Sequence, residues 1–94
     1  MDDYVIKTDP KIIRFIENHL MLGWYIDVTG CYCSIVGKYL FCIFVNSDTN
    51  ELELTVSKGG DYNSITMEWE TLENLTDSEI NLRIKELCEI YINL

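Results

Sequence analysis

Four cysteines and a single histidine are the residues of this sequence with the most specific chemistry. Cys31 and Cys33 lie one residue apart, and His19, Cys42 or Cys88 would have to complete a zinc site with them. Zinc-binding cysteines are usually spaced more widely, within a tight turn, whereas this pair lies in an apolar, strand-like stretch. A catalytic thiol needs a nearby cation or helix start to lower its pKa, and no cysteine here has one close in sequence. We therefore expect buried free thiols, no metal and no cofactor.

Two pairs of glutamates are the other residues that suggest chemistry. Glu51 and Glu53 alternate with leucines, and Glu68 and Glu70 flank a tryptophan. Paired carboxylates serve glycoside hydrolysis when a pocket raises the pKa of one of them, and they bind calcium when six to eight oxygens converge. An open strand surface offers no such pocket, and the segment 48–51 lacks the spacing of a calcium loop. His19 has no partner at a spacing typical of a catalytic triad, so we expect a protein that is not an enzyme.

The charge balance indicates what kind of partner the chain can approach. Its 94 residues carry 16 acidic and 7 basic side chains, a net charge of −9. Residues 1–47 hold five acids against four bases, and residues 48–94 hold eleven acids against three bases. A field of this sign repels nucleic-acid phosphates and anionic membranes, and it favours a basic protein partner. The alternative is that the acidity serves only solubility.

Length and hydropathy indicate one globular unit. The 94 residues suit a single α+β domain, 1–94, and a hydrophobic fraction of 48% is sufficient for a packed core. The longest apolar run, Tyr39–Val45, is far below the roughly 20 residues that span a bilayer. The opening Met1-Asp2-Asp3 does not resemble a signal peptide, so the expected location is cytoplasmic.

Two segments have helical periodicity. The first begins at Thr8-Asp9-Pro10, an N-cap candidate followed by proline, and its apolar spacing predicts a helix over residues 9–22 that ends at Gly23. The second begins with a capping box of Thr76 and Glu79, together with a hydrophobic staple. Its core-facing positions are Ile80, Ile84, Leu87, Cys88 and Tyr91.

The region between the two helices has the pattern of strands. Gly37-Lys38, with glycine first, is typical of a two-residue type II′ hairpin, although one long strand with a bulge at Gly37 is an alternative. Strict alternation predicts two further strands. The predicted strands are Trp24–Thr29, Cys31–Val36, Tyr39–Val45, Glu51–Ser57 and Ser64–Thr71. We expect an antiparallel β-meander of three to five strands with the N-terminal and C-terminal helices packed on one face.

The last two predicted strands have a sensible apolar face if they form a hairpin centred near Gly60. That register pairs Leu52 with Trp69, Leu54 with Met67 and Val56 with Ile65. The same register places Glu51 opposite Glu70 and Glu53 opposite Glu68 on the outward face. Like charges across a strand pair cost up to about 1 kcal/mol each. The acids therefore either deter edge aggregation or meet a basic partner.

A second feature points to an interface. The strand Tyr39–Val45 is apolar on both faces, and only one face can lie under the helices. The other face needs a partner, a dimer mate, or cover from Trp24 and the N-terminal segment. The expected partner-binding residues are the acids Glu51, Glu53, Asp61, Glu68, Glu70 and Glu73.

These features favour a small acidic inhibitor or antagonist of a basic, nucleic-acid-handling protein. The abundance of isoleucine, asparagine and tyrosine suggests an AT-rich genome, such as that of a low-GC bacterium or its phage. Phage anti-defence proteins of the anti-CRISPR kind and toxin-immunity proteins belong to this functional class. The alternative is a homodimeric structural or adaptor module.

Overall fold

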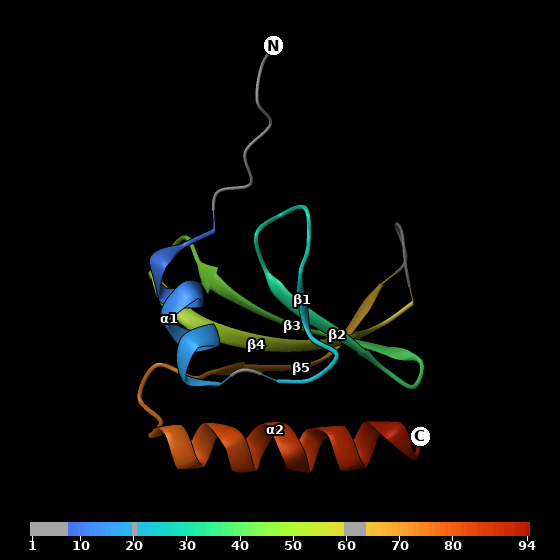
Figure 1. Ribbon diagram of the computed structural model, residues 1–94. Helices are drawn as coiled ribbons and strands as arrows, with labels where there is room; N and C mark the ends of the chain where they lie inside the picture. Colours follow the sequence, from blue (N-terminus) through green and yellow to red (C-terminus); the bar gives the residue numbers. More distant parts are fainter. Residues whose placement is uncertain (1–7, 20, 60–63) are drawn as a thin grey trace.

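The computed structural model describes residues 8–19, 21–59 and 64–94, which form one sheet and two helices (Figure 1). The sheet is an antiparallel meander with the strand order β1-β2-β3-β4-β5. The elements are α1 (Pro10–Asn18), β1 (Tyr25–Ile26), β2 (Tyr32–Val36), β3 (Tyr39–Asn46), β4 (Glu51–Lys58), β5 (Ile65–Thr71) and α2 (Asp77–Ile92).

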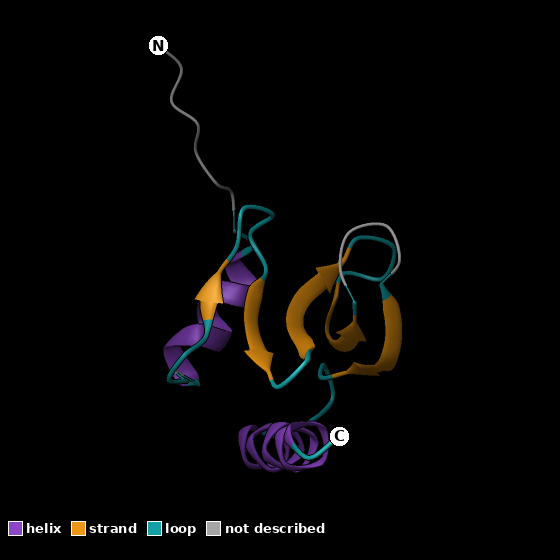
Figure 2. Cartoon of the chain, turned by 90° about the vertical axis from the view of Figure 1, so that its right-hand side faces the viewer, coloured by secondary structure: helices purple, strands orange, loops and turns teal. Residues whose placement is uncertain are grey.

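Both helices pack on the same face of the sheet, which confirms the predicted fold class. Figures 1 and 2 show α2 running along one side of the strands, and Figure 1 shows α1 beside the start of β4. Phe41, Ile43, Leu54 and Val56 project from β3 and β4 into this core and are fully buried. Within the described ranges, neither helix combines the length and the apolarity needed to cross a membrane.

The two-residue turn between β2 and β3 is present, as the sequence predicts. Val36 pairs with Tyr39, so Gly37 and Lys38 alone form the connection. Gly37 has a φ of +62°, and Lys38 is not among the residues with positive φ, which agrees with a type II′ turn. A Cβ on Gly37 would lie 3.4 Å from the carbonyl oxygen of Tyr91 in α2, so the turn is also a close contact between sheet and helix.

Helix α2 begins as predicted. The Thr76 hydroxyl accepts the Glu79 N–H at 3.2 Å, and the Glu79 carboxylate accepts the Thr76 N–H at 2.8 Å. These reciprocal bonds satisfy donors that a helix start otherwise leaves free. Ile80 one turn later is buried and Leu75 packs against the core, as expected of a hydrophobic staple.

Helix α1 is shorter than predicted. It ends at Asn18 rather than Leu22, with His19 at the C-cap and Gly23 in a separate turn. The His19 ring bonds to Asn81 and Asp77 of α2 and stacks on Phe15. These long-range contacts stop the helix, and they have no counterpart in local periodicity. Leu22, the last residue of the predicted helix, is fully exposed.

The predicted register of β4 and β5 is wrong. Leu54 pairs with Glu70 and Thr55 with Trp69, and a bulge follows between Val56 and Ser57. Between Glu68 and Thr71 this register differs from the prediction by three residues, an odd number, which exchanges the two faces of that part of β5. Leu72, just beyond the strand, is the residue that enters the core, and its N–H donates to the Leu52 carbonyl at 2.8 Å. Glu68 and Glu70 consequently face α2, and Trp69 faces outward.

Candidate functional site

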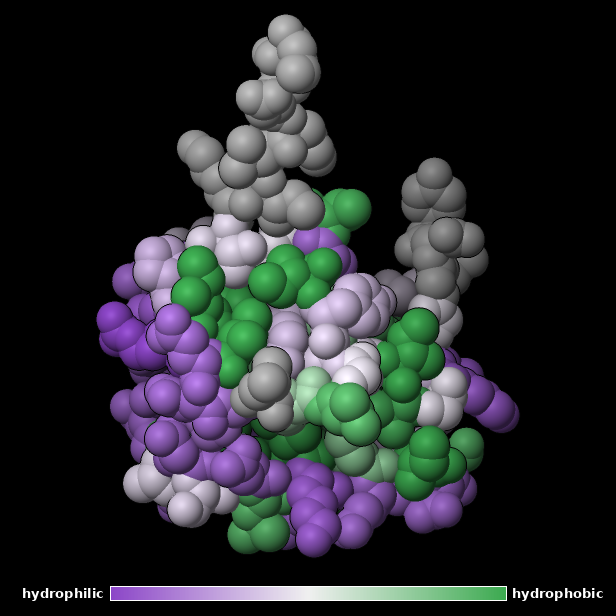
Figure 3. All heavy atoms as spheres, viewed as in Figure 1, coloured by the Kyte–Doolittle hydropathy of each residue, from purple (hydrophilic) through white to green (hydrophobic). Residues whose placement is uncertain are grey.

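The sheet has one face that no described helix covers. We call it the open face; it carries Tyr25, Ile35, Leu40, Phe44, Thr55 and Trp69, according to the strand pairings. Trp24 does not cover it, because its ring packs against Tyr32 and Phe41 on the helix side. The space-filling view shows a side of the molecule that carries the helices, with apolar side chains gathered over the β1–β2 region between the polar side chains of α1 and α2 (Figure 3). An uncovered face with large apolar side chains is typical of an interaction surface.

Trp69 is the most distinctive side chain of the open face. It is 61% exposed, yet its indole N–H donates to the Glu53 carboxylate at 2.8 Å. Its ring lies 6.4 Å from that of Phe44, inclined at 60°. An exposed tryptophan held by both a hydrogen bond and a ring contact loses little conformational entropy on binding, which suits an interface anchor.

Glu53 is a buried carboxylate beneath this tryptophan. It is 8% exposed and accepts a second hydrogen bond, at 3.0 Å, from the Asn46 side chain. Two donors offset part of the cost of burying the charge. Glu51 lies on the same face of β4, and Asp48 is exposed in the preceding turn. We call Phe44, Asp48, Glu51, Glu53 and Trp69 the Trp69 patch, an aromatic pair with carboxylates at one end.

The structure does not bring the four predicted strand glutamates onto one surface. Glu68 accepts a hydrogen bond from the Tyr91 hydroxyl at 2.7 Å, on the helix side of the sheet. Burial and this carboxylate raise the pKa of Tyr91 to about 12. Glu70 accepts a bidentate pair of hydrogen bonds from Arg83, and this pairing raises the pKa of Arg83 above its ordinary value. The expected cross-strand repulsion is therefore absent, since both carboxylates have partners on α2.

Charge reversal at Glu70 tests this arrangement. Glu70→Lys is expected to destabilise the fold by about 1–2 kcal/mol, because it removes the Arg83 pair and places two cations together. The expected loss is small because Arg83 is about a third exposed and solvent screens the pair. The control is Glu51→Lys on the open face, which should change the unfolding free energy by less than about 0.5 kcal/mol. Urea unfolding of both variants measures the difference in the free energy of unfolding. If Glu70→Lys were more stable than the wild type, the observed register would be contradicted and the register predicted from the sequence would be supported.

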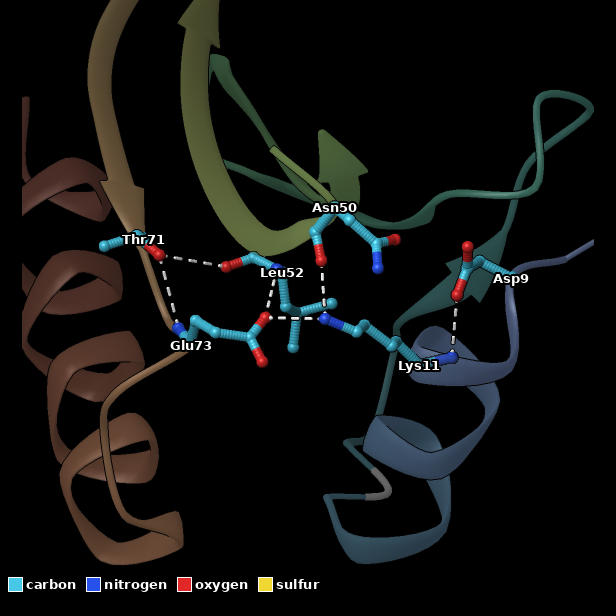
Figure 4. A network of polar contacts seen from close by, with 6 residues as sticks. All are labelled: Asp9, Lys11, Asn50, Leu52, Thr71 and Glu73. Atoms are coloured by element: carbon cyan, nitrogen blue, oxygen red, sulfur yellow. Dashed lines mark hydrogen bonds and ion pairs between the residues drawn. The ribbon is translucent and has the colours of Figure 1, made fainter. Parts of the chain in front are cut away.

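Glu73 lies in a network that ties α1 to the end of the sheet (Figure 4). Its carboxylate accepts the Leu52 N–H at 2.8 Å and the Lys11 ammonium at 3.0 Å. The Leu52 N–H and then the Lys11 ammonium lower the pKa of Glu73 below its ordinary value of 4.5. Glu73 therefore has a role within the fold. Asp61, the sixth predicted site residue, lies outside the described residues.

Acid titration should reveal this network. Because the folded-state pKa of Glu73 is lowered, its stabilising contribution is complete above pH 4.5 and is lost as the pH falls through the folded value. Glu73→Gln should therefore lose stability relative to wild type at pH 6, and the difference should shrink as the pH falls below 4.5. Chemical denaturation at a series of pH values measures this, with the exposed Glu17→Gln as control. A difference that does not change with pH would contradict the assignment.

A cleft of about 260 Å³ opens between α1 and the start of α2. His19 lies in its wall with both ring nitrogens engaged, Nδ1 to Asn81 at 2.8 Å and Nε2 to Asp77 at 3.1 Å. The described residues lining the cleft include no serine, threonine or cysteine that would act as a nucleophile beside it. The contacts of His19 are those of a residue that joins two helices.

The cysteines fall into two groups. Cys33 and Cys42 are directly opposite each other in β2 and β3, with Sγ atoms 3.5 Å apart, and Cys31 lies at the start of the same segment. Cys88 lies half-buried on α2. Among the residues that the structure describes, no group of three or more histidine, cysteine, aspartate or glutamate side chains is arranged to hold a metal ion.

Comparison of the chain with family models, with curated proteins and with solved structures finds no match. The interpretation of the Trp69 patch therefore rests on the geometry of its residues alone. Sequence reasoning identified its two strand glutamates but placed Trp69 in the core. The signal that would have corrected this is Leu72, because a core leucine three residues after Trp69 requires the tryptophan to face the other way.

Proposed function

We propose that this chain is a small, non-enzymatic binding protein that docks the Trp69 patch on a basic protein surface. It acts there as an inhibitor or antagonist of its partner, in the functional class of phage anti-defence proteins and toxin-immunity proteins. The observation that carries the proposal is the exposed Trp69 ring held over a buried carboxylate on an uncovered sheet face.

The chemistry of the patch supports a cationic partner group. A guanidinium or ammonium over an exposed indole gains a cation–π contact, and arginine does so most often. Glu51 lies at the start of β4 and the exposed Asp48 in the turn before it, so both add negative charge toward this end of the patch. The net charge of −9 adds long-range attraction, which raises the association rate with a basic protein.

Affinity capture with the immobilised chain tests the proposal. The wild type is compared with Trp69→Ala and with Leu82→Ala, which truncates an equally exposed apolar side chain on α2. A basic protein retained by the wild type and by Leu82→Ala, lost from Trp69→Ala, and released by salt is the expected result. Retention of the same protein by all three chains would contradict a role for the Trp69 patch.

A homodimeric module is the second candidate, and a specific observation favours it. β5 is the last strand of the sheet, so one of its edges pairs with no described strand, and Ile65, Met67 and Trp69 on it are exposed. Such an edge can pair with a second copy. Light scattering separates the two candidates. If the chain is a dimer in solution and captures no basic protein, the antagonist proposal fails. The chain is then a homodimeric module whose acidity serves solubility.

A further inference from the structure

We propose that Cys33 and Cys42 are a thiol pair that closes to a reversible cross-strand disulfide when the chain meets a disulfide oxidant such as oxidised glutathione. The two residues are direct partners in adjacent antiparallel strands, and their Sγ atoms lie 3.5 Å apart. This proposal is independent of the Trp69 patch and of any partner.

The hairpin register places the pair at a position that accepts a disulfide. The closing pair of the two-residue turn, Val36 and Tyr39, exchanges both backbone hydrogen bonds, and the pair types then alternate along the strands. Cys33 and Cys42 are the third pair after this closing pair, so they form a non-hydrogen-bonded pair. Such pairs have Cα atoms about 4.5 Å apart, within the range of about 4.4–6.8 Å that disulfides occupy. Closure therefore requires no change of register.

A hydrogen-bonded carboxylate lies beside the pair. The carboxylate of Asp27 lies 3.5 Å from Cys33 Sγ and accepts its S–H, and it also accepts the N–H groups of Thr29 and Cys31. Burial acts to raise the pKa of Asp27, but the hydrogen bonds from Thr29, Cys31 and Cys33 outweigh it and lower the pKa. The loop that these bonds hold lies against Cys33, which is buried although its strand position faces away from the helices.

The same surroundings make the reaction slow near neutral pH. The hydrogen bond with Cys33, followed by burial, raises the pKa of Cys42 far above its ordinary value. Since the thiolate is the attacking species, oxidation should accelerate as the pH rises.

The chemistry balances with glutathione disulfide as the oxidant. One protein thiol loses its proton, and its thiolate attacks a sulfur of the oxidant, releasing one glutathione and leaving a mixed disulfide. The second protein thiol loses its proton and attacks the protein sulfur of that mixed disulfide, releasing the second glutathione. Two protein thiols are thus oxidised by two electrons, and one glutathione disulfide is reduced to two glutathione thiols.

Peptide mapping of the full chain after equilibration in a glutathione buffer tests the proposal. Free thiols are alkylated, and the unreduced chain is cut with trypsin, which cleaves after Arg14, Lys38 and Lys58. Residues 15–38 and 39–58 should appear as one disulfide-linked species that separates on reduction. Formation should be faster at pH 9 than at pH 7, and the oxidised chain should melt several degrees higher than the reduced chain.

Serine variants identify the bridge. Cys31→Ser and Cys88→Ser should keep the linked species, whereas Cys42→Ser should abolish it. Loss of the link in Cys31→Ser would assign the bridge to Cys31 and Cys42 and overturn the proposal. The proposal would also be overturned if the wild-type chain stays fully reduced, or if it carries only glutathione adducts or intermolecular bridges. This result comes from the wild type alone and does not depend on the folding of any variant.

Discussion

Trp69→Ala is expected to weaken binding of the partner by about 2–4 kcal/mol, roughly 30- to 1000-fold in Kd. The indole is the largest exposed side chain of the patch, and its position is already set by Glu53 and Phe44. Truncation removes the contact area and the cation–π partner together. The loss should appear mainly in the dissociation rate, because the long-range charge that governs encounter is unchanged.

Calorimetric titration of the captured partner measures this effect. The matched control is Leu82→Ala, which should leave Kd within about threefold of wild type, since Leu82 lies on the outer side of α2. Glu51→Lys adds a second readout, because it should slow association and reduce the dependence of the association rate on salt. Equal affinities for Trp69→Ala and wild type would remove Trp69 as the anchor.

Phe41→Ala should have the largest effect on stability, about 3–5 kcal/mol. Phe41 has no exposed surface, and its ring meets those of Trp24 and Tyr91 at centroid distances of 6.2 and 6.1 Å. Truncation therefore leaves a cavity between the sheet and α2. Because domains of this size are stabilised by about 5–15 kcal/mol, the variant should approach the limit of folding, with a melting temperature lowered by roughly 15 °C or more.

Phe44→Ala is the matched control, because Phe44 lies on the same strand but on the open face. Its truncation removes contact with Trp69 and should cost clearly less, about 1–2 kcal/mol. Thermal and urea unfolding of the two variants give the comparison. Similar losses for both would mean that the open face is as well covered as the core.

The elements that were predicted correctly have signals contained within a few residues. The capping box at Thr76 and Glu79 and the two-residue turn at Gly37 each specify a local backbone geometry, and the structure has both. The stripe of α2 is confirmed in the same way, since Ile80, Ile84, Leu87 and Tyr91 are buried. Local chemistry and tertiary structure agree at these positions.

The elements that were predicted incorrectly depend on contacts between distant parts of the chain. α1 ends where His19 meets Asn81, 62 residues further along the chain. In β5, strict alternation marks two faces but does not say which one is buried. The choice rests on Leu72 and on the partners that Arg83 and Tyr91 provide for Glu70 and Glu68.

The candidate site was correspondingly predicted only in part. Glu51 and Glu53 lie on the open face, and Glu53 is buried rather than free. Glu68, Glu70 and Glu73 have partners inside the fold. The aromatic part of the patch was missed, because the alternating pattern of β5 is compatible with a tryptophan in the core and with a tryptophan on the open face.

Acrylamide quenching of tryptophan fluorescence tests whether Trp69 stands exposed on the open face and is covered by the partner. In a Trp24→Phe chain, Trp69 is the only tryptophan, so the signal reports its exposure alone. We expect strong quenching in the free chain and marked protection when the captured basic partner is present at saturation. A Trp69 that resists quenching in the free chain, or that is quenched equally in the complex, would contradict the claim that it stands on an open face and anchors the partner.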